Sequence, residues 1–302
     1  MSELKNEFSW SKTREEVLKT CPRQYWFFYH GYWNGWLVNA PERTRQIYVL
    51  KSLKNRHMWA GEKIHECIQR SLNNVRRGIK VLRVDEIVSI TLDQMRAEFR
   101  SSKSKNYWKN PKSCGLFEHE YEVEVSDEEW KEVAGNVETC LRKFYASDIY
   151  DGLKSHAKEG WLEVEEFPFF YLDRTKISLV IDCAIKEGEG IYIYDWKTGK
   201  SLSEDLSIQL GCYALYAMEK WNVPPESLSV IEYNLSFDKS SWFSVSQDEI
   251  KKVKGSINGS IKDMQSLLID RSNNIPMEED RFSKIEDEHI TSRCNFRKVC
   301  KK

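Results

Sequence analysis

Residues 176–200, KISLVIDCAIKEGEGIYIYDWKTGK, decide the fold because they form two apolar runs on either side of a short Gly/Glu turn. Each run has the composition of a β-strand, rich in Ile, Val and Tyr. Each also contains one aspartate, Asp182 or Asp195, where an apolar residue would pack better. The two carboxylates therefore point to a function for this hairpin beyond packing.

The turn predicts how the two strands pair. A type II′ turn requires glycine at its first central position, and Gly188 followed by Glu189 meets that requirement. In the resulting antiparallel register Asp182 lies opposite Asp195, on the same face of the sheet and about 5 Å away. Lys197, two residues further on, points to the same face. The register predicts a cluster of two carboxylates and one ammonium group.

Two carboxylates at that separation repel each other by roughly 3 kcal/mol at an effective dielectric constant of about 20. A shared proton, a neighbouring cation or a bound divalent metal would offset this repulsion. Carboxylate oxygens are preferred ligands of Mg2+, and Lys197 is close enough to contact a phosphate oxygen. A glycosidase-type carboxylate pair also fits a separation of about 5 Å but leaves Lys197 without a role. The TGKS segment at 198–201 is not a phosphate-binding loop. Such a loop requires a glycine five residues before Gly199, and Tyr194 occupies that position.

The overall composition is that of a packed globular protein. The chain has 302 residues, of which 40% are hydrophobic and 13% aromatic, and this excludes intrinsic disorder. It has no apolar run long enough to cross a bilayer, and the N-terminal residues lack the apolar stretch of a signal peptide. We therefore expect a cytoplasmic protein whose eight cysteines are thiols or metal ligands, not disulfides.

The net charge of −1 conceals an uneven distribution. Residues 41–80 contain ten Lys or Arg against three acids, whereas residues 115–170 contain fifteen acids against five bases. One interpretation is two solvated helical faces; the other is a basic footprint for a polyanion on the first segment. The second interpretation makes four basic residues candidates for substrate binding: Arg43, Arg45, Lys51 and Lys54.

Hydrophobic periodicity predicts an α/β fold with a helical block inserted at about 80–150. Four expected helices begin near Thr13 and at residues 61, 84 and 127. A further helix is expected over 205–219, and the last one begins after Ser246. The expected strands are 161–172, 176–186, 191–197, 227–236 and 241–246. The absence of a Gly/Ser-rich or Pro-rich linker favours one domain over residues 1–302, ending in a cysteine-containing tail at 271–302.

Five short motifs occur in an order that resembles the PD-(D/E)xK nuclease superfamily, and specifically its RecB-like branch. They are FSWSKTREEVLKTCPRQYWFF at 8–28, GEKIH at 61–65, VID at 180–182, DWKTG at 195–199 and QLGCY at 209–213. Each motif alone is weak, but together they cover most of the chain. The resemblance implies a restriction-endonuclease-like core, with a central mixed β-sheet flanked by helices.

The resemblance also implies roles for individual residues. The implied metal ligands are His65, Asp182, Asp195 and the backbone carbonyl of Trp196; Lys197 would orient or activate the attacking water, and Gln209 and Tyr213 would flank the site. The implied activity is Mg2+- or Mn2+-dependent cleavage of nucleic acid, with DNA expected, in repair, recombination or antiviral defence beside a partner such as a helicase. Two alternatives stay open: a non-cleaving nucleic-acid-binding or scaffold subunit, and a hydrolase of another phosphorylated substrate.

Some RecB-like nucleases hold an iron–sulfur cluster with one N-terminal cysteine and a C-terminal Cys-x2-Cys-x5-Cys motif. Cys21, Cys294 and Cys300 match three of these four positions, but the remaining position is Thr291. A cluster normally takes four protein ligands, so the match is one thiolate short. His289 completing the site, a zinc ion in place of the cluster, and a decayed site with three thiols are the alternatives.

Overall fold

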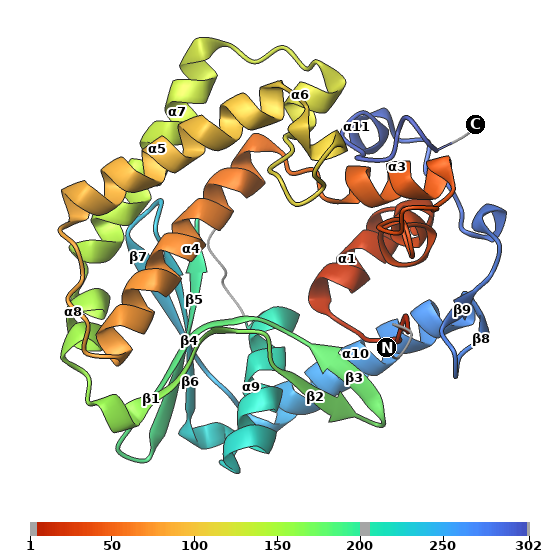
Figure 1. Ribbon diagram of the computed structural model, residues 1–302. Coiled ribbons are helices and arrows are strands. Elements are labelled where there is room, and N and C mark those ends of the chain that lie inside the picture. The colour runs from red at the N-terminus through yellow and green to blue at the C-terminus, as the bar shows by residue number, and fades with distance from the viewer. Residues whose placement is uncertain (1–4, 200–205, 301–302) are drawn as a thin grey trace.

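Figure 1 shows the computed structural model, which describes residues 5–199 and 206–300. Its centre is a five-stranded sheet in the order β1-β4-β5-β6-β7. The strands are β1 Trp161–Glu166, β4 Ile181–Glu187, β5 Gly190–Lys197, β6 Leu228–Asn234 and β7 Lys239–Ser244. Strands β5 and β6 run parallel, and the other neighbouring pairs are antiparallel. The predicted central mixed sheet is confirmed.

The β4–β5 hairpin has the predicted register. Glu187 pairs with Gly190, and the ladder continues to the pair of Cys183 and Tyr194, one position before the two aspartates. Gly188 has a φ of +59°, the left-handed conformation that glycine adopts without strain. A turn of two residues therefore sets which side chains share a face at the far end of the hairpin.

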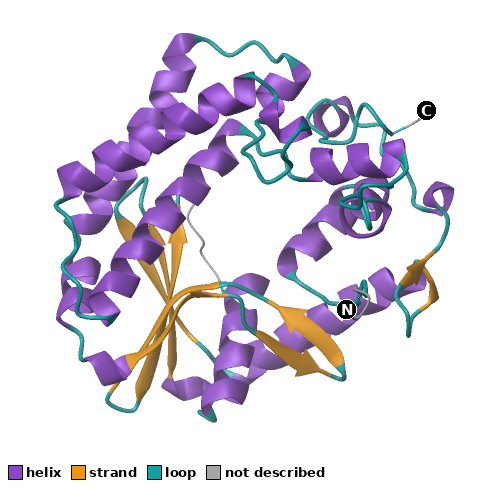
Figure 2. Ribbon diagram, in the orientation of Figure 1, coloured by secondary structure: helices purple, strands orange, loops and turns teal. Residues whose placement is uncertain are grey.

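Helices cover both faces of the sheet (Figure 2). On one face lie α9 Ile208–Trp221 and α10 Gln247–Ser266, and on the other lie α4 Arg56–Arg76, α5 Val84–Lys103, α7 Asp127–Tyr145 and α8 Asp148–Ser155. Trp196 packs on the second face, stacked on Tyr194 and edge-on to Phe144. Alternation along β5 therefore sends Asp195 to the face that α9 covers.

The first helix begins near the predicted Thr13. Helix α1 Lys12–Thr20 starts one residue earlier and is capped by Ser11, whose side chain accepts a hydrogen bond from the Arg14 N–H. The helix does not continue through Pro22, which begins a new helix, α2 Pro22–Trp26. Proline suits the first position of a helix because the missing N–H would have no partner there. A π-helical segment Phe27–Gly31, α3 Glu42–Lys51, α6 Phe117–Tyr121 and α11 Glu288–Thr291 complete the α- and π-helices of the described chain.

Two predicted strands are each divided in two. The run 161–172 breaks before Pro168, and the run 176–186 breaks after Ser178. The separated pieces, β2 Phe169–Leu172 and β3 Thr175–Ser178, form a small hairpin of their own beside the main sheet. A second small pair is β8 Leu268–Asp270 with β9 Ile275–Pro276. Helix α9 begins at Ile208, and residue 205 of the predicted helix lies outside the described residues.

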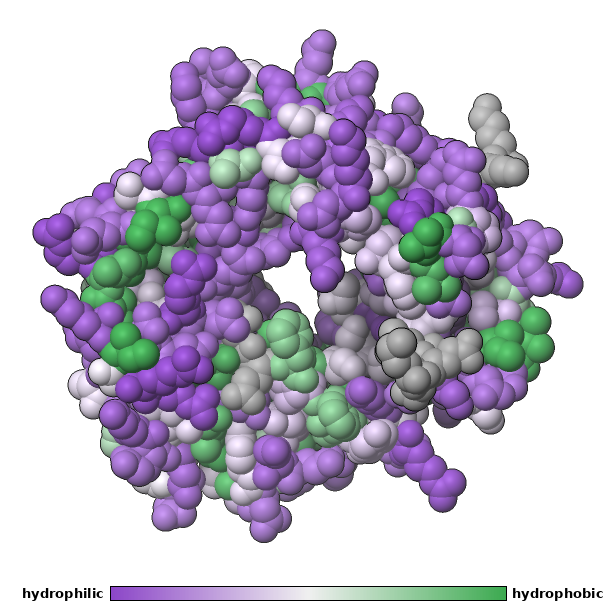
Figure 3. Space-filling view, viewed as in Figure 1, coloured by the Kyte–Doolittle hydropathy of each residue, from purple (hydrophilic) through white to green (hydrophobic). Residues whose placement is uncertain are grey.

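The elements are arranged in a ring. Figure 1 shows α4 on one side of a central opening and α1 on the other, and Figure 3 shows that the opening passes through the molecule. The lower border contains α9 and the β2–β3 hairpin. Within the described residues, none of the helices combines enough length and apolar character to span a membrane.

Gly211 allows α9 to pack closely on α10. A Cβ added there would lie 2.4 Å from Val253 Cγ2. We expect Gly211→Ala to destabilise the fold by about 1–3 kcal/mol through overpacking, in spite of alanine's higher helix propensity. Urea unfolding would measure the change. In a Val253→Ala background the same substitution should cost nothing, and an equal cost in both backgrounds would contradict this packing.

Candidate active site

Three carboxylates lie side by side across the central strands. Asp182 on β4, Asp195 on β5 and Glu232 on β6 are 4%, 2% and 3% exposed, and Glu232 is the register partner of Asp195. Glu232 was not among the residues predicted from the sequence. The available signal was a single acid in the apolar strand LSVIEYN, but its pairing with β5 depends on a parallel contact between segments distant in sequence.

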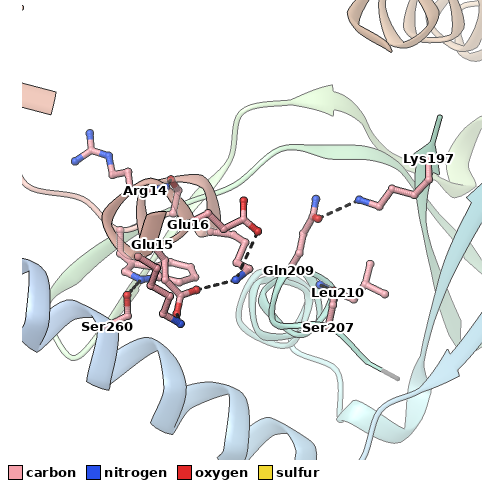
Figure 4. A network of polar contacts seen from close by, with 12 residues as sticks. Arg14, Glu15, Glu16, Lys197, Ser207, Gln209, Leu210 and Ser260 are labelled. Carbon is pink, nitrogen blue, oxygen red and sulfur yellow. Dashed lines mark hydrogen bonds and ion pairs between the residues drawn. The ribbon is translucent and has the colours of Figure 1, made fainter. Parts of the chain in front are cut away.

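Three polar groups hold Asp195 in place. The Tyr213 hydroxyl and the Gln209 amide donate to its Oδ1 at 3.0 and 3.2 Å, and Lys197 Nζ lies 2.6 Å from its Oδ2. Gln209 also donates to the Tyr213 hydroxyl at 2.7 Å and accepts from Lys197 at 3.0 Å. Figure 4 shows Gln209 on α9 pointing toward Lys197. The four-residue spacing of Gln209 and Tyr213 places both on one side of α9, where they reach the same carboxylate.

Asp182 is held from two directions. The backbone N–H of Trp196 donates to its Oδ2 at 2.7 Å, which fixes the carboxylate against β5. His65 on α4 approaches from the other side, with Nδ1 3.2 Å from Asp182 Oδ1. The structure thus brings together all six side chains that the sequence placed at this site, although they come from α4, β4, β5 and α9.

The carboxylates set the charge state of Lys197. Burial alone would lower the pKa of Lys197, but the nearby charges of Asp195, Glu232 and Asp182 outweigh burial and raise it. Burial and the Asp195 carboxylate likewise raise the pKa of Tyr213 well above its usual value. Lys197 is therefore an ammonium group at neutral pH, and Tyr213 is a phenol whose hydroxyl donates a hydrogen bond to Asp195.

The donor set fits a hard divalent cation. Asp182, Asp195 and Glu232 carry a formal charge of −3 against +1 on Lys197, and carboxylate oxygens are the ligands that Mg2+ and Mn2+ prefer. Within residues 5–199 and 206–300, no three His, Cys, Asp or Glu side chains already stand in metal-binding geometry. Lys197 and the Trp196 N–H each contact one aspartate oxygen, and each of these oxygens has a second lone pair for a cation.

A pocket of about 810 Å3 opens directly onto Asp182, Asp195 and Lys197. Besides the six side chains of the site, its lining includes residues from the start of α1 and from the β2–β3 hairpin: Trp10, Ser11, Lys12, Thr13, Phe167, Pro168, Phe169 and Lys176. These elements also border the central opening (Figure 1). Backbone hydrogen bonds join the two elements, from the Trp10 N–H to the Lys176 carbonyl and from the Ser178 N–H to the Trp10 carbonyl, so they form one continuous wall of the pocket.

Arg43 and Arg45 do not line this pocket. The Arg43 guanidinium forms two hydrogen bonds to Glu279, at 2.7 and 2.9 Å, and one to the Val299 carbonyl at 3.0 Å. Arg45 donates to the Leu37 carbonyl at 3.0 Å. Arg43 thus anchors the C-terminal segment, and substrate binding by Arg43 and Arg45 stays a prediction.

Lys51 and Lys54 line a second, larger pocket of about 1120 Å3 between α3, α4 and the segment before α6. Lys51 lies over the Tyr32 ring at 3.3 Å, and burial lowers the pKa of Lys51 to about 8. Lys54 is ion-paired with Glu62. Acidic partners outside the segment offset part of the +7 balance of residues 41–80: Glu279 pairs with Arg43, Glu129 with Arg56 and Glu98 with Lys63. The basic segment is therefore partly structural, and its role in contacting a polyanion stays a prediction.

The three predicted cysteines converge on a small cavity. Cys21, Cys294 and Cys300 line a space of about 270 Å3 together with Thr291. Burial raises the pKa of Cys294 to about 11 and also raises that of Cys300. His289 is exposed and does not line the cavity. Three thiols and a hydroxyl do not fit a cluster that needs four thiolates.

The family model of the PD-(D/E)XK nuclease superfamily matches residues 9–301, and the chain therefore belongs to this superfamily. Members of the superfamily are generally nucleases. No curated protein matches the chain.

Proposed function

We propose that this protein is a RecB-like nuclease that hydrolyses phosphodiester bonds, with DNA as its substrate. One observation carries the proposal: Asp195 is held by Tyr213 and Gln209, paired with protonated Lys197, and opposed by Asp182 at the floor of a pocket. A scaffold protein would gain nothing from burying opposed carboxylates, which cost free energy unless a cation offsets them. The catalytic interpretation therefore explains more of the structure than the scaffold alternative does.

Asp182, Asp195, His65 and the backbone carbonyl of Trp196 are the groups that we propose hold the metal. A divalent cation bound there would lower the pKa of the attacking water and stabilise negative charge on the phosphate. Tyr213 and Gln209 keep Asp195 in one orientation, because both donate to the same oxygen. The backbone N–H of Trp196 does the same for Asp182.

Lys197 acts as a cation in this mechanism and not as a base. Its raised pKa keeps the ammonium protonated at neutral pH, so it has no lone pair with which to accept a proton from water. It can instead donate to a phosphate oxygen, where negative charge increases in the transition state. Gln209 holds the ammonium on the pocket side of Asp195 through its 3.0 Å contact.

The test is cleavage of end-labelled DNA and RNA, linear and circular, by the purified protein with Mg2+ or Mn2+. We expect metal-dependent cleavage of DNA that EDTA abolishes. Preferred cleavage of RNA would correct the substrate, whereas binding without cleavage under all conditions would favour the scaffold alternative. A role in repair, recombination or antiviral defence, and a helicase as partner, are proposals that rest on membership of the RecB-like branch.

Tyr213→Phe tests how Asp195 is positioned. The change removes one hydroxyl, which takes away one of the two donors to Asp195 Oδ1 and one of the two acceptors of the Gln209 amide. We expect the cleavage rate to fall about 10- to 100-fold and the free energy of unfolding to fall by about 1–3 kcal/mol. Single-turnover kinetics and urea unfolding would measure the two effects.

Tyr216→Phe is the matched control for Tyr213→Phe. Tyr216 lies three residues further along α9, is equally buried, and donates its hydroxyl to Glu163. It does not line the active-site pocket. We expect a similar loss of stability with cleavage close to that of the wild type. Equal losses of activity in the two variants would mean that the Tyr213 hydroxyl supports only the fold.

A further inference from the structure

Aromatic side chains are exposed on the hairpin at the rim of the active-site pocket. Phe167 is 80% exposed, and Phe169 and Tyr171 are 50% and 57% exposed. Two of the three, Phe167 and Phe169, line the same pocket as the carboxylates. Their exposure leaves large apolar rings in water within reach of the substrate path, although a folded chain usually buries rings of this size.

A basic residue accompanies these rings. Lys176 on β3 places its ammonium 4.5 Å from the centre of the Phe169 ring and also lines the pocket. The β2–β3 hairpin holds this pair in register, with Tyr171 opposite Lys176, while the intervening Phe170 is buried and anchors the strand. The hairpin therefore presents flat apolar surfaces and a positive charge together, beside the groups proposed to cut a phosphodiester.

We propose that the hairpin binds unpaired bases, with Phe167 and Phe169 stacking against them and Lys176 contacting the adjacent phosphate. This inference rests on the proposed function and narrows its substrate to single-stranded nucleic acid or a frayed duplex end. In a duplex, the faces of each base are covered by its neighbours, so they cannot stack on a side chain. A single strand offers both free base faces and phosphates, which is the combination that aromatic and basic side chains recognise together.

The test compares two single-stranded DNA ligands of equal length, one with bases and one abasic, by fluorescence anisotropy. All proteins carry Lys197→Met, and Mg2+ is present, so that the strand is bound without being cut. We expect the Phe167→Ala/Phe169→Ala variant to bind the base-containing strand roughly 5- to 100-fold more weakly. Binding of the abasic strand should not change, because it retains every phosphate.

Phe237→Ala/Trp242→Ala is the matched control. These aromatic residues are 46% and 57% exposed, comparable to Phe169, but neither lines the pocket. We expect the control to bind both ligands as the parent protein does. Equal losses in both double variants, or an equal loss for both ligands, would overturn base stacking at the hairpin.

Single substitutions at Phe169 separate stacking from general apolar contact. Phe169→Tyr keeps an aromatic face and should retain binding, whereas Phe169→Leu keeps much of the apolar surface and should lose it. The opposite order would overturn the proposal. If binding follows the expected pattern but the wild-type protein cleaves no nucleic acid, the stacking site stands and the proposed nuclease function fails. If the wild-type protein cleaves DNA but shows no preference for bases over abasic sites, only the stacking site fails.

Discussion

A Lys197→Met variant is expected to cleave nucleic acid on the order of a thousandfold more slowly than the wild-type protein, because a preorganised charge that stabilises the transition state contributes about that much. Methionine has nearly the same length and apolar stem, so the change removes the charge and little packing. Lys197 lies 2.6 Å from Asp195 and faces the pocket, so substrate can reach its ammonium. Single-turnover cleavage at saturating metal would measure the loss.

Lys186→Met is the control for removing a lysine from the same hairpin. Lys186 is exposed on β4 opposite Ile191, at the end of the hairpin away from the aspartates. We expect it to cleave at the wild-type rate. Circular dichroism and thermal melts should show that both variants are folded. A Lys197→Met protein that cuts at an undiminished rate would remove Lys197 from the proposed mechanism.

The part of the site that could be predicted from sequence is the part that depends on local geometry. A two-residue turn at Gly188 sets the register of the hairpin, and the period of the strands then places Asp182, Asp195 and Lys197 on one face. No contact between distant segments is needed for this inference. His65, Gln209 and Tyr213 required the family resemblance, because α4 and α9 reach the hairpin only through tertiary packing.

The roles that the sequence did not indicate depend on partners distant in sequence. Arg43 belongs to a basic segment, but its ion pair with Glu279 spans 236 positions, and no local pattern indicates it. Glu232 was missed for the same reason, since β6 joins β5 through a parallel contact across α9. Net charge over a segment is thus a weak predictor of a binding surface when many of its charges form ion pairs within the fold.

The C-terminal segment is held by packing and ion pairs with the N-terminal half. Phe296 is fully buried between Phe27 and Phe28, with ring centroids at 4.9 and 4.7 Å. Arg297 lies over the Tyr121 ring at 3.9 Å, and the Tyr121 hydroxyl donates to the Asn295 carbonyl. These contacts surround the cavity that Cys294 lines, so the segment has a means of attachment that requires no metal.

Phe296→Ala is therefore expected to lower the free energy of unfolding by about 3–5 kcal/mol, the usual cost of removing a buried phenylalanine ring. The melting temperature should fall by roughly 5–10 °C. Treatment of the wild-type protein with a chelator selective for iron and zinc should leave that temperature unchanged, because three thiols are one ligand short of a complete cluster. Phe237→Ala, which removes a ring that is 46% exposed, is the matched control and should change the melting temperature little. The opposite pattern, a protein sensitive to the chelator and indifferent to the loss of Phe296, would show that a metal bound by the cysteines holds the tail in place.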